Sequence, residues 1–338
     1  MTRGRFFTRR RLIAGSAAAI LPGSWDLAAQ AGRVSRVAIV ARPGLDQGQA
    51  TPGEVRSWDA WNDEMRRLGY TEGRNLAIER HVVEPKDVPK LVATLREGLP
   101  DAIFAPSQNI VMLLQHAGIA APVVTVAVDP VGSGLAESLA RPGGRITGFS
   151  LDAGTQTRVK RIALLKEASP KMTKVAFLML RQYWEGRWRT RAENAAGSLG
   201  LTAIGAPYEA GASEDAYRAI FARAAKEGAD GLYLSPALET VVRRRLIAEL
   251  ALSAGMASVS HYRDNVEAGG LMSYGADLAD IYRRSARYID RILRGADPGE
   301  MPFQQPTKFD LTLNMATAAA LGLEIPPTLL ALADDVFE

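Results

Sequence analysis

The sequence VAVDPVGSGLAESLARPGGRITGFS, residues 126–150, contains an apolar run, an Asp-Pro turn and two glycine clusters. A glycine-rich turn after a strand holds a pyrophosphate in dinucleotide-binding folds, where the pattern is G-x-G-x-x-G. Here Gly132 and Gly134 are followed by Glu137 in the third position, and its carboxylate would repel a pyrophosphate. We therefore interpret the stretch as a strand, a turn, a short helix over residues 135–139, a second turn and another strand.

On both sides of this stretch, short apolar runs alternate with longer amphipathic runs. The predicted strands lie at residues 36–41, 75–82, 101–105, 122–128, 145–150, 174–180, 201–206, 230–235, 257–262, 270–275 and 303–314. The predicted helices lie at residues 53–68, 87–97, 109–118, 158–168, 187–199, 214–226, 240–253 and 277–294. The alternation pauses at the polar residues 149–157 and then starts again. This pattern predicts an α/β fold of two doubly wound parallel-sheet lobes with a hinge at the pause.

The first 31 residues have the basic start, apolar run and Ala-Gln-Ala end of a cleaved export signal, and their run of arginines resembles a twin-arginine signal. The apolar run at residues 12–21 is too short to span a bilayer, which needs about 20 residues. Five arginines of this segment stand against one aspartate, so the formal charge of +4 belongs to the signal. No nucleic-acid partner is therefore expected.

The chain has no cysteine, which excludes disulfides, thiol nucleophiles and an N-terminal lipid anchor. We expect a soluble, monomeric protein of a bacterial periplasm. Signatures of phosphate loops, zinc proteases and serine hydrolases are missing from the sequence. The three histidines are His81, His116 and His261, and only His261 ends a strand that would face the proposed cleft. The sequence thus favours a protein that is not an enzyme and has no cofactor and no metal site.

Polar and aromatic side chains follow the ends of the predicted strands in both halves. In doubly wound sheets this edge binds ligands. The candidate ligand-binding residues are Arg42, Ser107, Gln108, Asn109, Asp129, Tyr183, Trp184, Arg187, Ser235, Glu239, Tyr262, Arg263 and Tyr274. Aromatic faces combined with a few fixed polar groups suit a small organic solute. We expect Arg187 or Arg263 to pair with a carboxylate, and Asp129 or Glu239 to bind an amine.

Several motifs resemble the ABC-transporter substrate-binding protein family. They are VDPVGSGLAESLARPGGRITGFS, LGYTEGRNLAIE, IPPTLLALADDVFE and the run from GGLMSYGADLADIYRRSARYIDRILRG into PFQQPTKFDLTLN. The resemblance covers residues 34–338 and implies a type I periplasmic-binding-protein fold whose lobes close on a ligand. It places the three crossings near residues 150–153, 274–276 and 302–307. Lobe 1 would hold residues 34–151 and 275–303, and lobe 2 residues 152–274 and 304–338.

The resemblance also implies a function. The chain would be the receptor of an ABC importer, would dock on a membrane permease, and would carry an amino-acid-like or aromatic carboxylate solute. The sequence departs from the family pattern at residues 41–42, in APSQNIV at residues 105–111 and in RQYWEGRW at residues 181–188, all at the cleft. Because of these departures, the resemblance does not specify which ligand the chain binds. The alternatives are an exported sensing module for a signalling receptor and, less favoured by the motifs, an exported enzyme.

Overall fold

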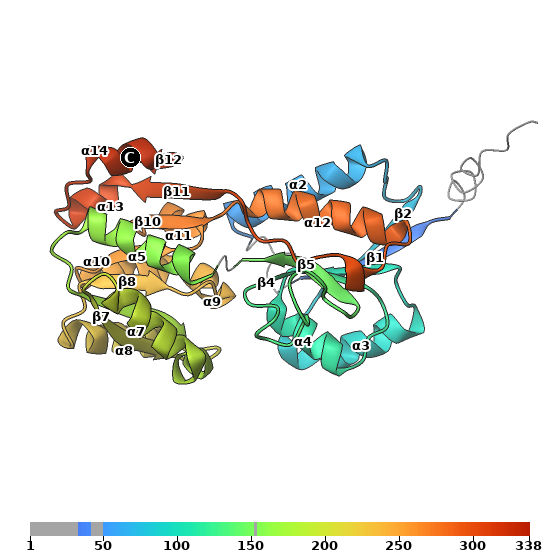
Figure 1. Cartoon of the computed structure of the whole chain (residues 1–338), viewed down its shortest axis with the longest axis horizontal. Coiled ribbons are helices and arrows are strands. Elements are labelled where there is room, and N and C mark those ends of the chain that lie inside the picture. The colour runs from blue at the N-terminus through green and yellow to red at the C-terminus, as the bar shows by residue number, and fades with distance from the viewer. Residues whose placement is uncertain (1–32, 42–49, 152–153) are drawn as a thin grey trace, which may run out of the picture.

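The chain folds into two α/β lobes, each with its own sheet (Figure 1). The structure is a computed structural model and describes residues 33–41, 50–151 and 154–338. The predicted export signal and Arg42 lie outside these residues. Two sheets of parallel strands covered by helices confirm the predicted fold class.

Lobe 1 has a five-stranded sheet in the order β2-β1-β3-β4-β5. Its strands are β1 (Ser35–Ala41), β2 (Leu76–Val82), β3 (Ala102–Ala105), β4 (Val123–Ala127) and β5 (Ile146–Ser150), and all are parallel. Helices α3 (Val88–Glu97) and α4 (Gln108–His116) cover one face, and α2 (Pro52–Arg67) and α12 (Leu278–Leu293) cover the other. Because both faces are covered, β3, β4 and β5 are buried along their whole length.

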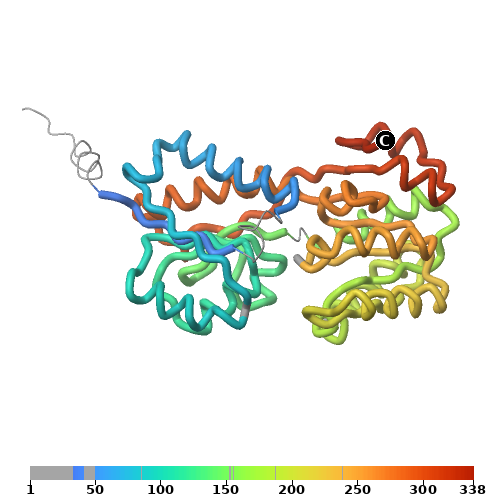
Figure 2. Tube along the Cα trace, turned by 180° about the vertical axis from the view of Figure 1, so that it is seen from behind, coloured from blue at the N-terminus to red at the C-terminus, as the bar shows by residue number. Residues whose placement is uncertain are grey.

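Helix α2 begins at a capping box next to the other lobe. The Thr51 side chain accepts a hydrogen bond from the Glu54 amide at 3.1 Å, and the Glu54 carboxylate accepts one from the Thr51 amide at 2.9 Å. This reciprocal pairing satisfies two amide groups that the first turn of a helix leaves unpaired. Beside α2 lies α12, which belongs to lobe 1 although it follows a strand of lobe 2 (Figures 1 and 2).

Lobe 2 has a seven-stranded sheet in the order β12-β11-β10-β9-β8-β6-β7. Its strands are β6 (Lys174–Leu180), β7 (Thr202–Tyr208), β8 (Gly231–Leu234), β9 (Ala257–Ser260), β10 (Met272–Ala276), β11 (Phe309–Asn314) and β12 (Asp335–Phe337). Its helices are α5 (Thr155–Ala168), α6 (Arg181–Tyr183), α7 (Arg189–Gly197), α8 (Glu214–Lys226), α9 (Leu238–Val242), α10 (Arg244–Ser253), α11 (Arg263–Glu267), α13 (Met315–Ala320) and α14 (Pro327–Leu332). Only the β10–β11 pair is antiparallel, because β11 enters the sheet from the hinge.

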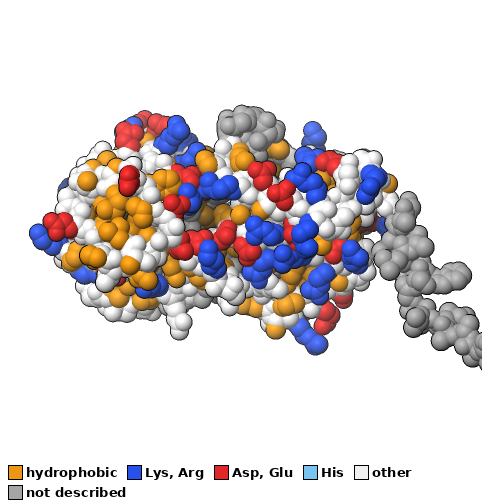
Figure 3. All heavy atoms as spheres, turned by 90° about the horizontal axis from the view of Figure 1, so that it is seen from above, with side chains coloured by type: hydrophobic (Ala, Val, Ile, Leu, Met, Phe, Trp, Pro, Cys, Tyr) orange, Lys and Arg blue, Asp and Glu red, His pale blue; other side chains and the backbone are white. Residues whose placement is uncertain are grey.

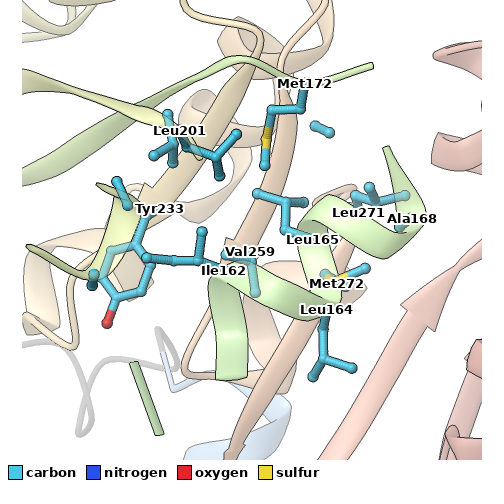
Figure 4. Close-up of a cluster of buried hydrophobic side chains, with 14 of the residues drawn as sticks. Ile162, Leu164, Leu165, Ala168, Met172, Leu201, Tyr233, Val259, Leu271 and Met272 are labelled. Carbon is cyan, nitrogen blue, oxygen red and sulfur yellow. The ribbon is translucent and has the colours of Figure 1, made fainter. Parts of the chain in front are cut away.

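The core of lobe 2 forms on both faces of this sheet. Helices α5, α7, α13 and α14 pack on one face, and α8 and α10 pack on the other. Figure 4 shows Ile162 and Leu165 of α5 against Val259 and Tyr233 of the sheet. Helix α5 is thereby fixed to lobe 2 immediately after the chain leaves β5.

The chain passes between the lobes beside β5. After β5 it enters α5, after β10 it enters α12, and it returns to lobe 2 before β11. The returning segment pairs with β5, since the Ser150 amide donates to the Gln304 carbonyl at 2.8 Å and the Gln304 amide donates to the Gly148 carbonyl at 3.0 Å. Two of the connecting segments are therefore hydrogen-bonded side by side.

The stretch from residue 126 to residue 150 has a structural role. Residues 135–139 form bends and irregular backbone, so the predicted short helix there is wrong. Gly134 and Gly143 have φ of 75° and 79°, which only glycine adopts without strain. A Cβ on Gly143 would also lie 2.5 Å from the carboxyl carbon of Glu137. These glycines shape turns that join β4 to β5.

Other boundaries differ from the sequence prediction in lobe 2. The predicted helix at residues 240–253 is two helices, α9 and α10, and the one at residues 187–199 starts with a wide turn over Trp184–Trp188. The short helix α11 and the strand β12 have too few residues to show periodicity. Within the described ranges, none of the helices combines the length and hydrophobicity needed to cross a bilayer.

Candidate ligand-binding site between the lobes

Residues that follow strands of one lobe contact residues that follow strands of the other. In the first interlobe contact, the Gly53 amide of α2 donates a hydrogen bond to Asp264 Oδ1 at 2.9 Å. Asp264 follows β9 and is 5% exposed. Beside it, Arg56 of α2 forms an ion pair with Glu267 of α11 at 3.2 Å. A carboxylate of lobe 2 is thus seated at the N-terminus of a lobe 1 helix, where the helix dipole favours negative charge.

The second interlobe contact joins α4 and the turn after β4 to α6 and α7. The Tyr183 hydroxyl donates to Asn109 Oδ1 at 3.4 Å, and Arg191 lies 3.7 Å from Asp129 Oδ2. These groups are partly exposed, so each contributes little by itself. Of these two interlobe contacts between described residues, the first includes a buried carboxylate and the second lies at the surface.

Two buried arginines of α5 lie near the connecting segments. Arg161 is 2% exposed, and its Nε donates to the carbonyl oxygen of Tyr274 in β10 at 2.5 Å. Arg158, also 2% exposed, places its guanidinium carbon 4.5 Å from the centre of the Trp188 ring. Arginine stays protonated when buried, so this part of the interface carries positive charge.

His261 is a neutral partner in this region. Burial lowers its pKa well below 6.5, and the nearby charge of Arg161 lowers it further. The Nδ1 atom lies 3.0 Å from the Leu234 carbonyl, so it must carry the proton. Nε2 then accepts from the Tyr233 hydroxyl at 3.2 Å. His261 is therefore held in one tautomer and orientation and adds no charge to oppose Arg161.

A cavity of about 380 Å³ lies beside the first interlobe contact. Its lining includes α2, α11, the end of β9, β10, β11 and the start of α12. Figure 3 shows acidic and basic side chains together on this side of the molecule. The volume is in the range of small-molecule sites. Both lobes contribute to its wall, as Gly53 and Ser57 from lobe 1 face His261 and Tyr262 from lobe 2.

The family model of the ABC transporter substrate binding proteins matches residues 51–337. The chain belongs to this family. A substrate-binding protein of this kind holds a small solute, and the family is a non-enzymatic class. The family match confirms the resemblance seen in the sequence motifs.

This substrate-binding protein is similar to proteins of several bacteria. It is 23% identical over 298 residues to the Tyrosine-binding protein of Clostridioides difficile, covering 85% of this chain and 79% of that protein. A structure of an ABC domain in complex with L-Trp from Streptococcus pneumonia has a TM-score of 0.78 at 18% identity, covering 90% of this chain and 100% of that one. A conserved domain protein from Vibrio cholerae has a TM-score of 0.80 at 22% identity, with the same coverage. These structures confirm the fold.

Several candidate residues of lobe 1 stabilise turns in the structure. Gln108 Oε1 accepts hydrogen bonds from the amides of Val128 and Asp129 at 2.9 and 3.1 Å. Asp129 Oδ1 accepts from the Gly132 amide at 2.8 Å. Asn109 is exposed and bonds to Tyr183, and Ser107 is the half-buried N-cap residue of α4. Gln108 and Asp129 thus hold this edge of the sheet in shape.

Two candidates of lobe 2 have partners within their own lobe. Arg263 forms ion pairs with Glu267 at 2.8 Å and with Asp335, and lies 5.0 Å from the Phe337 ring centre. The structure therefore shows Arg263 already neutralised. Trp184 stacks on Phe177 at 6.3 Å and fills the position that a Cβ on Gly205 would take. The Arg187 side chain lies outside the described part of the structure.

The remaining candidates lie at the carboxyl edge of the lobe 2 sheet. Tyr262 donates to the Pro236 carbonyl at 2.9 Å, and burial raises its pKa. Tyr274 stacks on Phe309 at 5.5 Å. Ser235 Oγ is buried without a hydrogen-bond partner among the described residues. Such a group is available to a ligand.

Glu239 belongs to the same edge. Its negative charge raises the pKa of three tyrosines already raised by burial, namely Tyr183, Tyr208 and Tyr217. No cationic side chain of the described residues pairs with Glu239.

Sequence reasoning missed Arg161 and Arg191, and it named no partner for Asp264, which it placed after the strand at residues 257–262. Arg161 is the least expected of these, because a cation in an amphipathic helix usually faces water. One pattern indicates its burial: Arg158, Arg161, Ile162 and Leu165 have the spacing of a single helix face. The contact of Asp264 could not be predicted, since its partner Gly53 lies 211 residues away along the chain.

Proposed function

We propose that this chain is the periplasmic receptor of an ABC importer. It captures an amino-acid-like or aromatic carboxylate solute between its lobes and presents it to a membrane permease. Hinge closure is the mechanism, in which the ligand favours the closed state by its contacts with both lobes. The predicted lobe boundaries and the export of the chain by residues 1–31 are part of this proposal.

The observation that carries the proposal is the contact between strand ends of the two lobes. Gly53 with Asp264, and Asp129 with Arg191, are polar pairs that exist only when the lobes are together. A solute that adds further contacts to both lobes would therefore stabilise this arrangement. The names of relatives that bind tyrosine or L-Trp support an aromatic amino acid as the first ligand to test.

A thermal-shift screen of the chain without residues 1–31 tests ligand capture. The panel holds the twenty amino acids, benzoate and 4-hydroxyphenylacetate. A ligand at 100 times its dissociation constant should add about 2.7 kcal/mol to the free energy of unfolding. If no panel compound raises the melting temperature and the chain converts one of them to a product, the receptor proposal is overturned.

Uptake distinguishes import from sensing. Cells that lack the chain should lose uptake of the labelled ligand and regain it when the chain is restored. Unchanged uptake, together with loss of a transcriptional response to the same ligand, would favour the sensing module instead.

A further inference from the structure

Arg161 carries a buried positive charge that no carboxylate of the described residues offsets. Its hydrogen bond among the described residues is from Nε to the neutral carbonyl of Tyr274. The other arginines of the interface differ, since Arg191 pairs with Asp129 and Arg263 pairs with two acidic residues. Arg161 is thus a buried cation of this interface that forms no ion pair with a described residue.

An uncompensated guanidinium is costly in a protein interior. Burial of an isolated charge is strongly unfavourable unless the charge is paired, and most ionisable groups escape the cost by losing their charge. Arginine cannot do so, because its pKa is above about 12. The charge of Arg161 acts on the pKa of His261 and of Tyr262, so both side chains lie near it, and both are neutral. Since no described carboxylate forms an ion pair with Arg161, a bound anion would supply the missing negative charge.

The position of Arg161 is suited to a ligand that closes the lobes. The residue lies in α5, directly after the first connecting segment, and is bonded to Tyr274 in β10, directly before the second. Tyr262 and His261, whose pKa values respond to the charge of Arg161, line the cavity that lobe 1 completes with Gly53 and Ser57. An anion at Arg161 would lie where groups of both lobes meet.

We propose that Arg161 binds the carboxylate of the ligand and defines the anionic end of the site. This proposal rests on the proposed receptor function and names its ligand class as a monocarboxylate. With Nε held by Tyr274, the two Nη groups remain to donate to the two oxygens of one carboxylate, as the planar guanidinium does elsewhere. A single negative charge balances the single positive charge. The site therefore assigns the carboxylate to Arg161, in place of Arg187 or Arg263.

Ligand binding tests the assignment with matched acids and amides. The probes are L-tyrosine with L-tyrosinamide, L-tryptophan with L-tryptophanamide, and benzoate with benzamide, measured by calorimetry on the chain without residues 1–31. At least one acid should bind, and its amide should bind at least 10-fold more weakly. Arg161→Gln should weaken acid binding by about 10-fold to 100-fold, which corresponds to a charged hydrogen-bond pair. Lys160→Gln, at an exposed position of the same helix α5, is the matched control and should bind as the unmodified chain does.

Unfolding without ligand gives a second, independent test. Because Arg161 is uncompensated, Arg161→Gln should leave the melting temperature unchanged or raise it. Equal binding of an acid and its amide, unchanged affinity in Arg161→Gln, or a melting temperature lowered by several degrees would overturn the assignment. If Arg161→Gln does not fold, Arg161→Lys must still prefer the acid over the amide. Should no probe bind the unmodified chain, the receptor proposal fails, while the melting temperatures still decide the role of Arg161.

Discussion

Replacing Gly53 with alanine would separate the lobes at their first contact. A Cβ at this position would lie 2.3 Å from Asp264 Oδ2 and 2.8 Å from Oδ1, so the carboxylate must leave its place. The hydrogen bond from the Gly53 amide, 2.9 Å long, would then be lost. A hydrogen bond to a charged group contributes about 1.5–3 kcal/mol. The closed state should become about 10-fold to 150-fold less populated relative to the open state.

The same change should leave lobe 1 itself intact. Gly53 lies in the first turn of α2 and does not have a positive φ, so an alanine fits the helix. Alanine is also the better helix former by up to about 1 kcal/mol. The expected outcome is a shift between two folded states, with an unchanged or slightly higher melting temperature. Ligand affinity should fall in proportion to the loss of the closed population.

Distance measurements between the lobes provide the assay. The chain has no cysteine, so Glu97→Cys on α3 and Lys226→Cys on α8 create two unique spin-label sites. Gly53→Ala should move the distance distribution to larger values. Gly197→Ala on α7, whose Cβ would meet nothing within 4 Å, is the matched control. Identical distributions and identical ligand affinities for Gly53→Ala and the control would refute the reasoning.

Three further changes have expected outcomes. His261→Gln should make the melting temperature fall less as the pH is lowered below 6.5. In the unmodified chain, the unfolded state binds a proton at His261 in this range and the folded state does not, because its pKa is lower. The free energy of unfolding therefore decreases by up to about 1.4 kcal/mol for each pH unit, and the variant removes this loss. Glu64→Gln should lower the free energy of unfolding at pH 7 by about 1–3 kcal/mol, and denaturant titrations should show the difference shrinking as the pH falls from 4.5 toward 2. The reason is that hydrogen bonds from Arg67 and Arg287 lower the pKa of Glu64 to about 2. Trp184→Ala should lower the free energy of unfolding, measured by calorimetry, by about 3 kcal/mol and should change ligand affinity less than two-fold. A large loss of affinity would instead show that Trp184 contacts the ligand.

The sequence was most informative where apolar residues form long runs or recur at a regular spacing. Parallel strands buried on both faces require continuous apolar runs, and the runs at β3, β4 and β6 predicted both sheets. Short helices and strands have too few residues to show a regular spacing of apolar side chains. The five residues of α11 and the three of β12 could not be predicted, and residues 135–139 have helix-like spacing but form bends and irregular backbone.

The candidate site was harder to predict because its chemistry depends on partners distant in the chain. Sequence places Arg263 and Asp129 after strands, but only the structure shows that both already have partners. In the same way, the sequence of α5 does not distinguish the buried Arg161 from the exposed Lys160. Only the contact of Arg161 with Tyr274 of β10 separates them. Residue type predicts the kind of interaction, while pairing decides which residues remain available to a ligand.

The position of α12 has a consequence for how the protein forms. Residues 35–150 supply every strand of lobe 1, yet one face of that sheet is covered by α2 alone until residues 278–293 have been made. Lobe 2 in turn depends on β11 and β12, the last strands of the chain. Neither lobe can therefore mature during synthesis of its own first segment. The sheet of lobe 1 receives its second covering helix once residue 293 has been made, and the sheet of lobe 2 receives β12 once residue 337 has been made.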